Sequence, residues 1–538
     1  MIFSETHIGR LDAALQRSWL PPLILLLASC AMYVPVILAH PEFYLDDFYF
    51  LALIDGGIFP HAFDGETYRY FASLRPLFML SLLADHALFG THSGWYYVMN
   101  LVLHGGAGVA LYHVLRRVFR MFFDADARLL SLLLALAFLV HADMFYGAVW
   151  ISNRTETLMV LLYLLTVLAT LRFLAHGQWR VLPVAVLLFL LTLAAKAQAA
   201  HFPLLLLFMG GVLLRRRKTP LGAVQIVLAS LPFFFLSAAY AWTTVQYDPA
   251  LGVVPWQYLP QKVMSAIGIL LIAVQPHLAE PAYAFFLQNK IAVLLLGIPL
   301  LGAAYFTWRR LSVRDRWLAV GLLLLYGILL YPRIMYYAAP RVNSLQVLFV
   351  IIVLGVITLR MRSTQRMWIP LLFLVLHFAG TIAFALPRWY VRADNARYVR
   401  LLSEEQNNPR RYYQVLHWQH YDPYAMHYFR HGSFGKDTLW TQSPVRIGLF
   451  YGRGTEFDYD VRSEAGAWVF SSDDPRIHFE RDTVKQIMQG TRFEWRREEM
   501  PQRFQEVVVH DDSLAPYVVP VIERNFQYEI LELPPRRP

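Results

Sequence analysis

A series of long apolar runs, separated by short polar links, is the feature that most constrains the fold of this chain. The hydrocarbon core of a bilayer is roughly 30 Å thick, and an apolar helix of about 20 residues can cross it. With 57% hydrophobic and 16% charged residues, the chain has the composition of a protein that crosses the membrane many times. The runs predict an all-α membrane bundle of about eleven spans. These spans fall near residues 19–39, 96–115, 129–145, 156–174, 181–195, 201–214, 221–243, 291–308, 317–331, 338–359 and 368–386.

The basic residues predict how the spans are oriented. Short links rich in arginine and lysine favour the cytoplasmic side of a membrane. Arg10 and Arg17 precede the first span, so the N-terminus is expected in the cytoplasm together with the basic link 215–218. The net charge of +10 therefore reflects membrane topology rather than binding of nucleic acid. The run 263–275 breaks the alternation of basic and weakly charged links, and we expect it to be re-entrant or interfacial.

Composition divides the chain near Pro387. Residues 1–386 are predicted to form the membrane domain, which includes a structured outer loop at 40–94. Residues 387–538 are rich in charged residues and alternate between a helical pattern and short β-like runs. They predict a soluble α/β or α+β domain on the outer face of the membrane. Cys30 is the only cysteine, and an outer domain without cysteines favours a bacterial inner membrane facing the periplasm.

Two adjacent carboxylates, Asp46 and Asp47, follow the first predicted span at the outer membrane surface. Neighbouring ionised carboxylates repel, and partial desolvation adds to this cost unless cations, hydrogen bonds or a metal offset it. The structural alternative is a helix N-cap, because Asp47 directly precedes an amphipathic run. Cations predicted on the same face of the membrane favour a functional role.

Several cations are predicted at the outer ends of spans, where the positive-inside bias does not place basic residues. They are Arg75, Arg154, Lys196, Arg333 and Arg341. Taken singly, each is compatible with a side chain that reaches lipid head groups. Taken together with the acidic pair, they predict a pocket that holds a phosphate while a carboxylate acts as a base. His141 is either hydrogen-bonded within the bundle or lines this pocket.

The same stretches resemble a known family. The acidic pair after the first span is similar to the motif of GT-C glycosyltransferases, which include protein O-mannosyltransferases and lipid A aminoarabinose transferases. Further stretches resemble the membrane half of the O-mannosyltransferases that carry tetratricopeptide repeats, and the resemblance covers roughly residues 20–360. They are Leu74-Arg-Pro-Leu77 with Leu88-Phe-Gly90, Tyr97-Val-Met-Asn-Leu-Val-Leu-His104, Trp150-Ile-Ser-Asn-Arg154, Ala195-Lys-Ala-Gln198 and Arg333-Ile-Met-Tyr-Tyr-Ala-Ala-Pro340. Gln198 stands where the family has glutamate, Asn153 stands where it has glycine, and the repeat domain is replaced by the C-terminal tail.

The resemblance implies an inverting glycosyltransferase that moves a sugar from a polyprenyl phosphate to an acceptor on the outer face of the membrane. It implies Asp46 as the general base and Asp47 as a residue that positions the acceptor or the sugar. The five cations, with Gln198 and His141, are then expected to bind the phosphate and sugar of the donor. No cofactor besides the donor lipid is fixed by the sequence. A divalent metal at Asp46 and Asp47 stays an open alternative, because some GT-C enzymes use one and others do not.

Two functions of other classes compete with this interpretation. A transporter or flippase for a lipid-linked anion also needs outward cations, but it typically places polar or broken segments at mid-membrane in two related halves. A membrane-anchored binding protein, whose spans present the C-terminal domain, leaves the acidic pair and the outward cations unexplained. The expected partners are the lipid bilayer, the polyprenyl-phosphate sugar and an acceptor that is a protein, a lipid or a glycan, with no nucleic acid.

Overall fold

The computed structural model describes residues 14–39, 75–90, 92–247, 344–360 and 367–386, the strands between residues 412 and 530, and a few isolated positions such as Asp47. The chain divides into two compact units. The first comprises Met1–Ala39 and Phe63–Pro387, and the second comprises His40–Ala62 and Arg388–Pro538.

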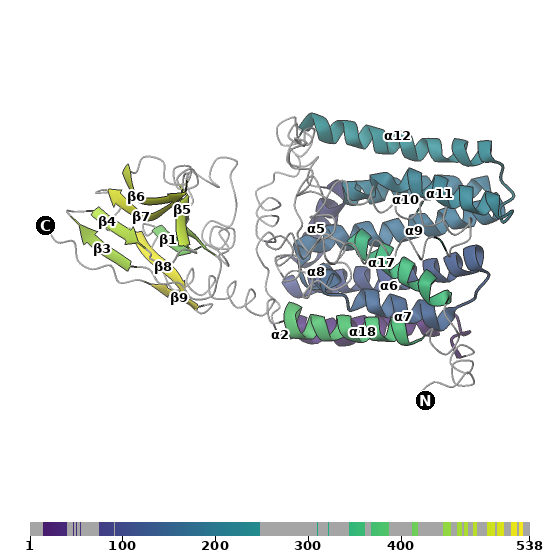
Figure 1. Ribbon diagram of the computed structural model, residues 1–538, viewed down its shortest axis with the longest axis horizontal. Helices are drawn as coiled ribbons and strands as arrows, with labels where there is room; N and C mark the ends of the chain where they lie inside the picture. Colours follow the sequence, from purple (N-terminus) through teal and green to yellow (C-terminus); the bar gives the residue numbers. More distant parts are fainter. Residues whose placement is uncertain are drawn as a thin grey trace. The chain divides into compact units, whose positions relative to one another are not determined.

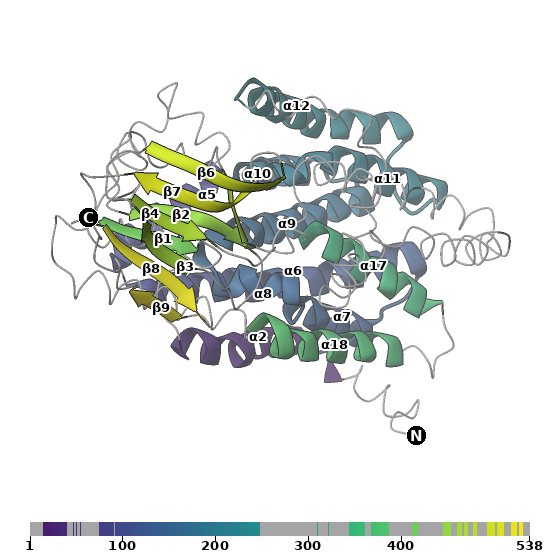
Figure 2. The ribbon, with the colours of Figure 1, turned by 60° about the vertical axis from the view of Figure 1, so that its left-hand side comes forward.

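The described part of the first unit is a bundle of helices that lie side by side (Figure 1). The helices are α2 (Leu20–Ala39), α5 (Pro76–Phe89), α6 (Ser93–Phe123), α7 (Arg128–Leu139), α8 (Ala142–Val149), α9 (Arg154–His176), α10 (Leu182–Ala195), α11 (Phe202–Arg215), α12 (Ala223–Tyr247), α17 (Ser344–Leu359) and α18 (Trp368–Gly380). Short 3₁₀ turns, η2 (Ile151–Asn153), η3 (Trp179–Val181) and η4 (Ala197–His201), join some of them, and a π-helical turn (Thr381–Ala385) extends α18. Helix α9 packs against both α6 and α10 near the middle of the bundle (Figure 2).

Among the described residues, five helical segments are long and apolar enough to cross a membrane, which indicates an integral membrane protein. The total of about eleven spans stays a prediction, because the runs 291–308 and 317–331 fall almost entirely outside the described residues. The re-entrant run 263–275 also lies outside them.

Two predicted spans differ from the helices that the structure contains. Helix α6 continues beyond the predicted end at residue 115 to Phe123, so Arg116, Arg117 and Arg120 lie on its last turns rather than in a link. The predicted span 129–145 is two helices, α7 and α8, which are separated at Val140 and His141. Apolar length alone predicts neither feature, because a helix can extend past the bilayer and a tertiary contact can interrupt it.

The end of α6 is held by charged side chains from the link to α7. The Asp126 carboxylate forms ion pairs with the guanidinium groups of Arg116 (3.0 Å), Arg120 (3.1 Å) and Arg128 (2.7 Å). Burial alone would raise the pKa of Asp126, but the hydrogen bonds and charges of Arg116 and Arg120 outweigh it and lower this pKa below its ordinary value. We call this side of the bundle the Arg116 end, and the opposite side, where α9 begins, the Arg154 end.

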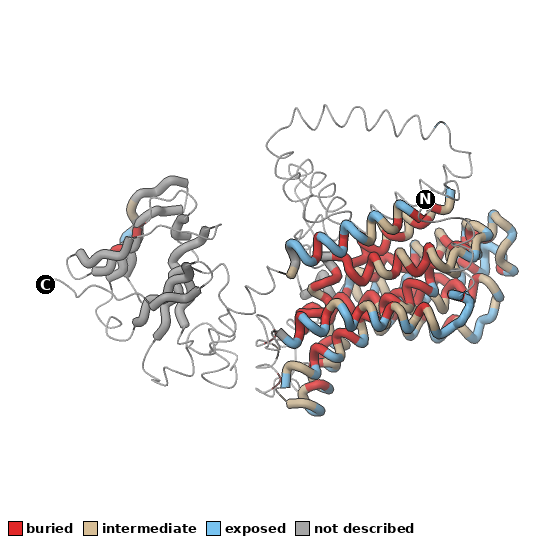
Figure 3. The backbone as a smooth tube through the Cα atoms, turned by 90° about the horizontal axis from the view of Figure 1, so that it is seen from below, coloured by how far each residue is buried: buried red, intermediate tan, exposed pale blue. Residues whose placement is uncertain are grey.

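Buried residues lie on the faces that the helices turn toward one another (Figure 3). At the contact of α6 with α7, Gly108 lies directly against Leu139. A β-carbon at position 108 would lie 2.8 Å from Leu139 Cδ2, which is closer than carbon atoms can approach. The absence of a side chain at Gly108 therefore sets the spacing of these two helices.

Gly108→Ala is accordingly expected to destabilise the bundle by about 1–3 kcal/mol, because the buried Leu139 must move to make room. Gly106→Ala is the matched control on the same helix, since its β-carbon would lie 3.7 Å from Leu161, an ordinary contact. The control is expected to be neutral or slightly stabilised, because alanine favours a helix more than glycine does. Thermal unfolding in detergent measures both, and equal midpoints for the two variants would contradict this account of the α6–α7 contact.

In the second unit, every residue that the structure describes beyond position 387 lies in a strand. The strands form a nine-stranded sheet in the order β3-β4-β7-β5-β2-β1-β8-β9, and β6 pairs with β7. Strand β1 is parallel to β2 and β8, whereas the other pairs are antiparallel. The strands are β1 (Tyr412–His417), β2 (Val445–Gly452), β3 (Asp460–Glu464), β4 (Ala467–Ser471), β5 (Ile477–Glu480), β6 (Arg492–Met500), β7 (Arg503–His510), β8 (Val518–Arg524) and β9 (Gln527–Ile530). The helical part of the predicted domain falls outside the described residues and stays a prediction.

Candidate functional site

The first turn of α9 gathers polar side chains from four other parts of the bundle. Arg154, Thr155 and Glu156 form this turn, and all three are buried. Each of the three contacts a charged or polar side chain from another segment, as described below. Since buried charges are costly unless they are paired, a concentration of them in an apolar bundle indicates either a structural network or a functional site.

Arg154 is held by α5 and α6. Its guanidinium contacts Asp85 (2.6 Å), Asn100 Oδ1 (2.6 Å), the Tyr96 carbonyl (2.9 Å) and the Ser81 hydroxyl (3.4 Å). Asn100 is oriented for this contact because its amide donates to the Trp150 carbonyl (3.1 Å). Arg154 is fully buried. The acceptors lie on several sides of its planar guanidinium, which presents donors in fixed directions. The network fastens the start of α9 to both neighbouring helices.

Lys196 and Glu156 form a second buried ion pair at the same end. Lys196 lies between the end of α10 and the turn η4, and its ammonium contacts Glu156 Oε1. Ser344, the first residue of α17, donates its hydroxyl to the other oxygen, Glu156 Oε2. The exposed fractions of Lys196 and Glu156 are 5% and 3%. One carboxylate therefore joins α9, α10 and α17.

Arg75 reaches the same turn from the start of α5. Its Nη1 donates to Thr155 Oγ1 at 2.8 Å, between the two residues that hold the ion pairs. The backbone of Arg75 is left-handed, with φ 67° and ψ 82°, although Pro76 follows it. Both the side chain and the following proline disfavour this conformation, which costs about 1–2 kcal/mol. Strained residues of this kind concentrate at functional sites, where the surrounding structure holds them.

A small cavity of about 10 Å³ lies beside Glu156. It is about the size of one water molecule. Its lining includes the polar residues His104, Asn153, Thr157 and Ser344. His104 also contacts the Leu139 carbonyl through Nε2 (3.2 Å), which connects this cavity to the break between α7 and α8.

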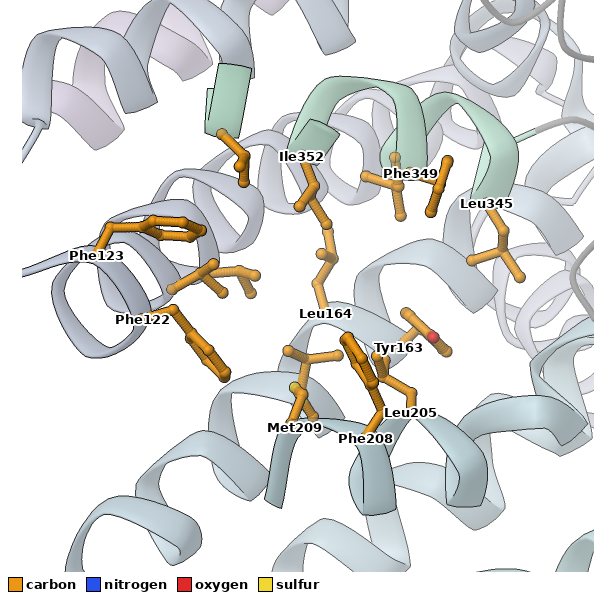
Figure 4. A pocket seen from close by; sticks show the side chains of 15 residues that line it. Phe122, Phe123, Tyr163, Leu164, Leu205, Phe208, Met209, Leu345, Phe349 and Ile352 are labelled. Carbon is orange, nitrogen blue, oxygen red and sulfur yellow. The ribbon is translucent and has the colours of Figure 1, made fainter. Parts of the chain in front are cut away.

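An apolar groove of about 120 Å³ lies in the same bundle, and Figure 4 shows the side chains that line it. It runs between α6, α9, α11 and α17, and no charged side chain is among its lining residues. Leu345 and Tyr163 line it nearest the polar cluster, since Leu345 follows Ser344 and Tyr163 is two helical turns beyond Glu156. Phe122 and Phe123 line it at the Arg116 end.

Tyr163 connects the groove to the segment that carries Lys196 and Gln198. Its hydroxyl lies 2.8 Å from His201 Nε2, and His201 Nδ1 lies 2.8 Å from the Gln198 carbonyl. A carbonyl only accepts, so Nδ1 carries the proton and Nε2 accepts from Tyr163. These two bonds fix the turn η4, so that the position of Lys196 is tied to α9 through two separate contacts.

The structure brings some of the predicted site residues together and places others elsewhere. Arg75, Arg154 and Lys196 meet at the first turn of α9, and Gln198 lies in the turn that follows Lys196. His141 stacks on His377 of α18, with ring centroids 4.1 Å apart, at the break between α7 and α8. Asp46, Arg333 and Arg341 lie outside the described residues.

Asp47 belongs to the second unit, where it is buried and has a helical conformation. An N-cap residue has non-helical backbone angles, so this conformation argues against the cap as the reason for an aspartate here. Among the described residues, no group of three or more His, Cys, Asp or Glu side chains is arranged to hold a metal ion. A metal at the acidic pair stays a prediction, since Asp46 is not described.

The site predicted from the sequence contained neither acid of this cluster, Asp85 or Glu156, and it did not contain Ser344 or the polar contacts Ser81, Asn100 and Thr155. Glu156 was easy to overlook because an acid in the first turn of a helix is favoured by the helix dipole alone. A usable signal was present, since an acid and a lysine predicted at the same depth of one membrane face are candidates for a pair. No comparable signal marks Ser344, which is 188 residues from its partner.

The sequence matches no known family model and no curated protein.

Proposed function

We propose that this chain is an inverting GT-C-type glycosyltransferase of the bacterial inner membrane. In this proposal it moves a sugar from a polyprenyl-phosphate donor to an acceptor on the periplasmic side. The proposal rests on one observation: a groove with an aliphatic and aromatic lining lies along α9 and α17, the helices whose first turns carry Glu156 and Ser344 of the buried cluster with Arg75 and Lys196. A lipid phosphate has the matching chemistry, with an apolar chain at one end and an anion at the other.

The groove suits the donor's isoprenoid. Its lining is aliphatic and aromatic. A chain bound there would place its phosphate near Lys196 and the first turn of α9. We propose that Lys196 and Arg75 contact this phosphate and offset the charge that develops on it as the sugar leaves. Arg154, whose donors reach α5 and α6, would position the turn, while Arg333 and Arg341 stay predicted phosphate ligands.

The chemistry requires one base and no general acid, because a phosphate is already a good leaving group. Asp46 would accept the proton of the acceptor hydroxyl as that oxygen attacks the anomeric carbon, and Asp47 would help to position acceptor or sugar. Attack from the face opposite to the phosphate inverts the anomeric configuration.

The test uses membranes that contain the full chain and their native acceptors. Synthetic polyprenyl phosphates that carry a radiolabelled sugar, such as β-mannose or β-glucose, are added. We expect label to move from the solvent-extractable lipid into a non-extractable product with an α-linkage. Membranes that lack the chain are the control. Equal transfer in both, or a product that retains the β-linkage, would contradict the proposal.

A further inference from the structure

We infer that the Glu156 carboxylate occupies an anion-binding subsite made by Lys196 Nζ and Ser344 Oγ, and that the phosphate of an isoprenoid lipid binds there by displacing it. This inference rests on the proposed function for the class of ligand, and it adds Glu156 and Ser344, which the sequence did not single out, to the predicted phosphate ligand Lys196.

The geometry of the carboxylate carries the inference. Its two oxygens are divided between two donors, since Oε1 contacts the Lys196 ammonium and Oε2 accepts from the Ser344 hydroxyl. A phosphate also presents two oxygens on one atom, and a lysine with a hydroxyl is a common pair of phosphate donors. The bound carboxylate therefore marks where an anion of this shape is stabilised.

The position of the subsite points to a lipid rather than a soluble anion. Ser344 directly precedes Leu345, and Tyr163 lies seven residues, or roughly 10 Å, along α9 from Glu156. Both Leu345 and Tyr163 line the apolar groove. A phosphate at Lys196 and Ser344 would thus bind at the first turns of the two helices, α9 and α17, that also line the groove.

A small space lies beside the carboxylate. Asn153, Thr157 and His104 are among the residues that line this cavity of about 10 Å³. In this inference the Glu156 side chain rotates toward the cavity when the anion takes its position on Lys196. Glu156 would then hold the charge of Lys196 in the empty protein and release it when the donor binds.

If the ligand and the Glu156 carboxylate compete, removal of the carboxylate charge should strengthen ligand binding. A purely structural ion pair predicts no such gain. Glu156→Gln keeps the size of the side chain and a carbonyl that accepts from Ser344, but it removes the competing negative charge. Stability without ligand should fall, because a buried cation loses its counter-charge. Affinity for a lipid phosphate should rise by a factor of about 5 to 150, the range of ordinary coupling between two sites.

Binding of farnesyl phosphate to the purified full chain in detergent tests this, with farnesol as the uncharged probe. We expect Glu156→Gln to bind farnesyl phosphate more tightly than the wild type and to bind farnesol equally well. Glu156→Asp, whose shorter side chain weakens the contact with Lys196 but keeps the charge, should fall between them. Ligand-induced shifts of the unfolding temperature report the same order.

Asp85→Asn is the matched control, because it also removes a buried carboxylate from a buried cation at this end of the bundle. It should lower the stability without raising the affinity. Equal or weaker binding in both Glu156 variants overturns the competition and leaves the proposed function standing. A gain in Asp85→Asn instead assigns the subsite to Arg154. If the wild type and all variants fail to bind farnesyl phosphate, the proposed function falls together with this inference.

Discussion

Replacing Asp46 with asparagine is expected to slow sugar transfer by about 10²- to 10⁴-fold, the range that a general base contributes to catalysis. Asparagine has nearly the same shape as aspartate, but its amide does not accept a proton from the acceptor hydroxyl. The variant should still insert into the membrane and bind the donor, because Lys196 and the apolar groove are unchanged. The transfer assay in membranes, normalised to the amount of protein, measures the loss.

Asp47→Asn is the neighbouring control. Asp47 is buried and helical in the second unit, and its proposed task is positioning, so we expect a smaller loss than for Asp46. If both variants keep the normal rate, the assignment of the base is wrong. If Asp47→Asn is the more damaging change and donor binding is intact, the two roles are exchanged.

Apolar length was enough to predict much of the bundle. Helices such as α2 and α12 lie within about a turn of their predicted ranges, because the thickness of the bilayer demands a certain run of apolar residues. The division of residues 129–145 into α7 and α8 was not predictable in this way. It depends on contacts made across the chain, such as Thr381 donating to the Val140 carbonyl at 2.6 Å and His377 stacking on His141.

The cations of the candidate site were predictable for a related reason. Basic residues at the predicted outer ends of spans contradict the usual bias, so Arg75, Arg154 and Lys196 were conspicuous in the sequence. Their partners were not, because a carboxylate such as Glu156 can serve as an ordinary helix-terminal charge as well as half of an ion pair. Ion pairs between distant residues form only when the helices pack together. These pairs determine which of the cations can contact a substrate.

Arg154 is a cation that already has a carboxylate partner, Asp85, and its removal is expected to have the largest effect on stability. Arg154→Met should destabilise the bundle by about 3–5 kcal/mol, because it leaves the Asp85 carboxylate buried beside an apolar side chain. The double variant Arg154→Met with Asp85→Leu should recover part of this loss, since no buried charge then remains from the pair. Recovery should be incomplete, because Asn100 and the Tyr96 carbonyl also lose the guanidinium. Unfolding in detergent measures the stability of the wild type, of each single variant and of the double variant.

The same double variant separates a positioning role of Arg154 from direct contact with a phosphate. If Arg154 only fastens the first turn of α9 to α5 and α6, farnesyl phosphate should bind the double variant with an affinity close to that of the wild type wherever the protein is folded. If Arg154 contacts the phosphate, affinity should fall even where stability has recovered, because a charge-assisted hydrogen bond is lost with it. In the second case affinity stays low although stability has recovered, whereas in the first case affinity is close to that of the wild type. Because Asp85, Asn100 and Ser81 already surround the guanidinium, we expect the first case.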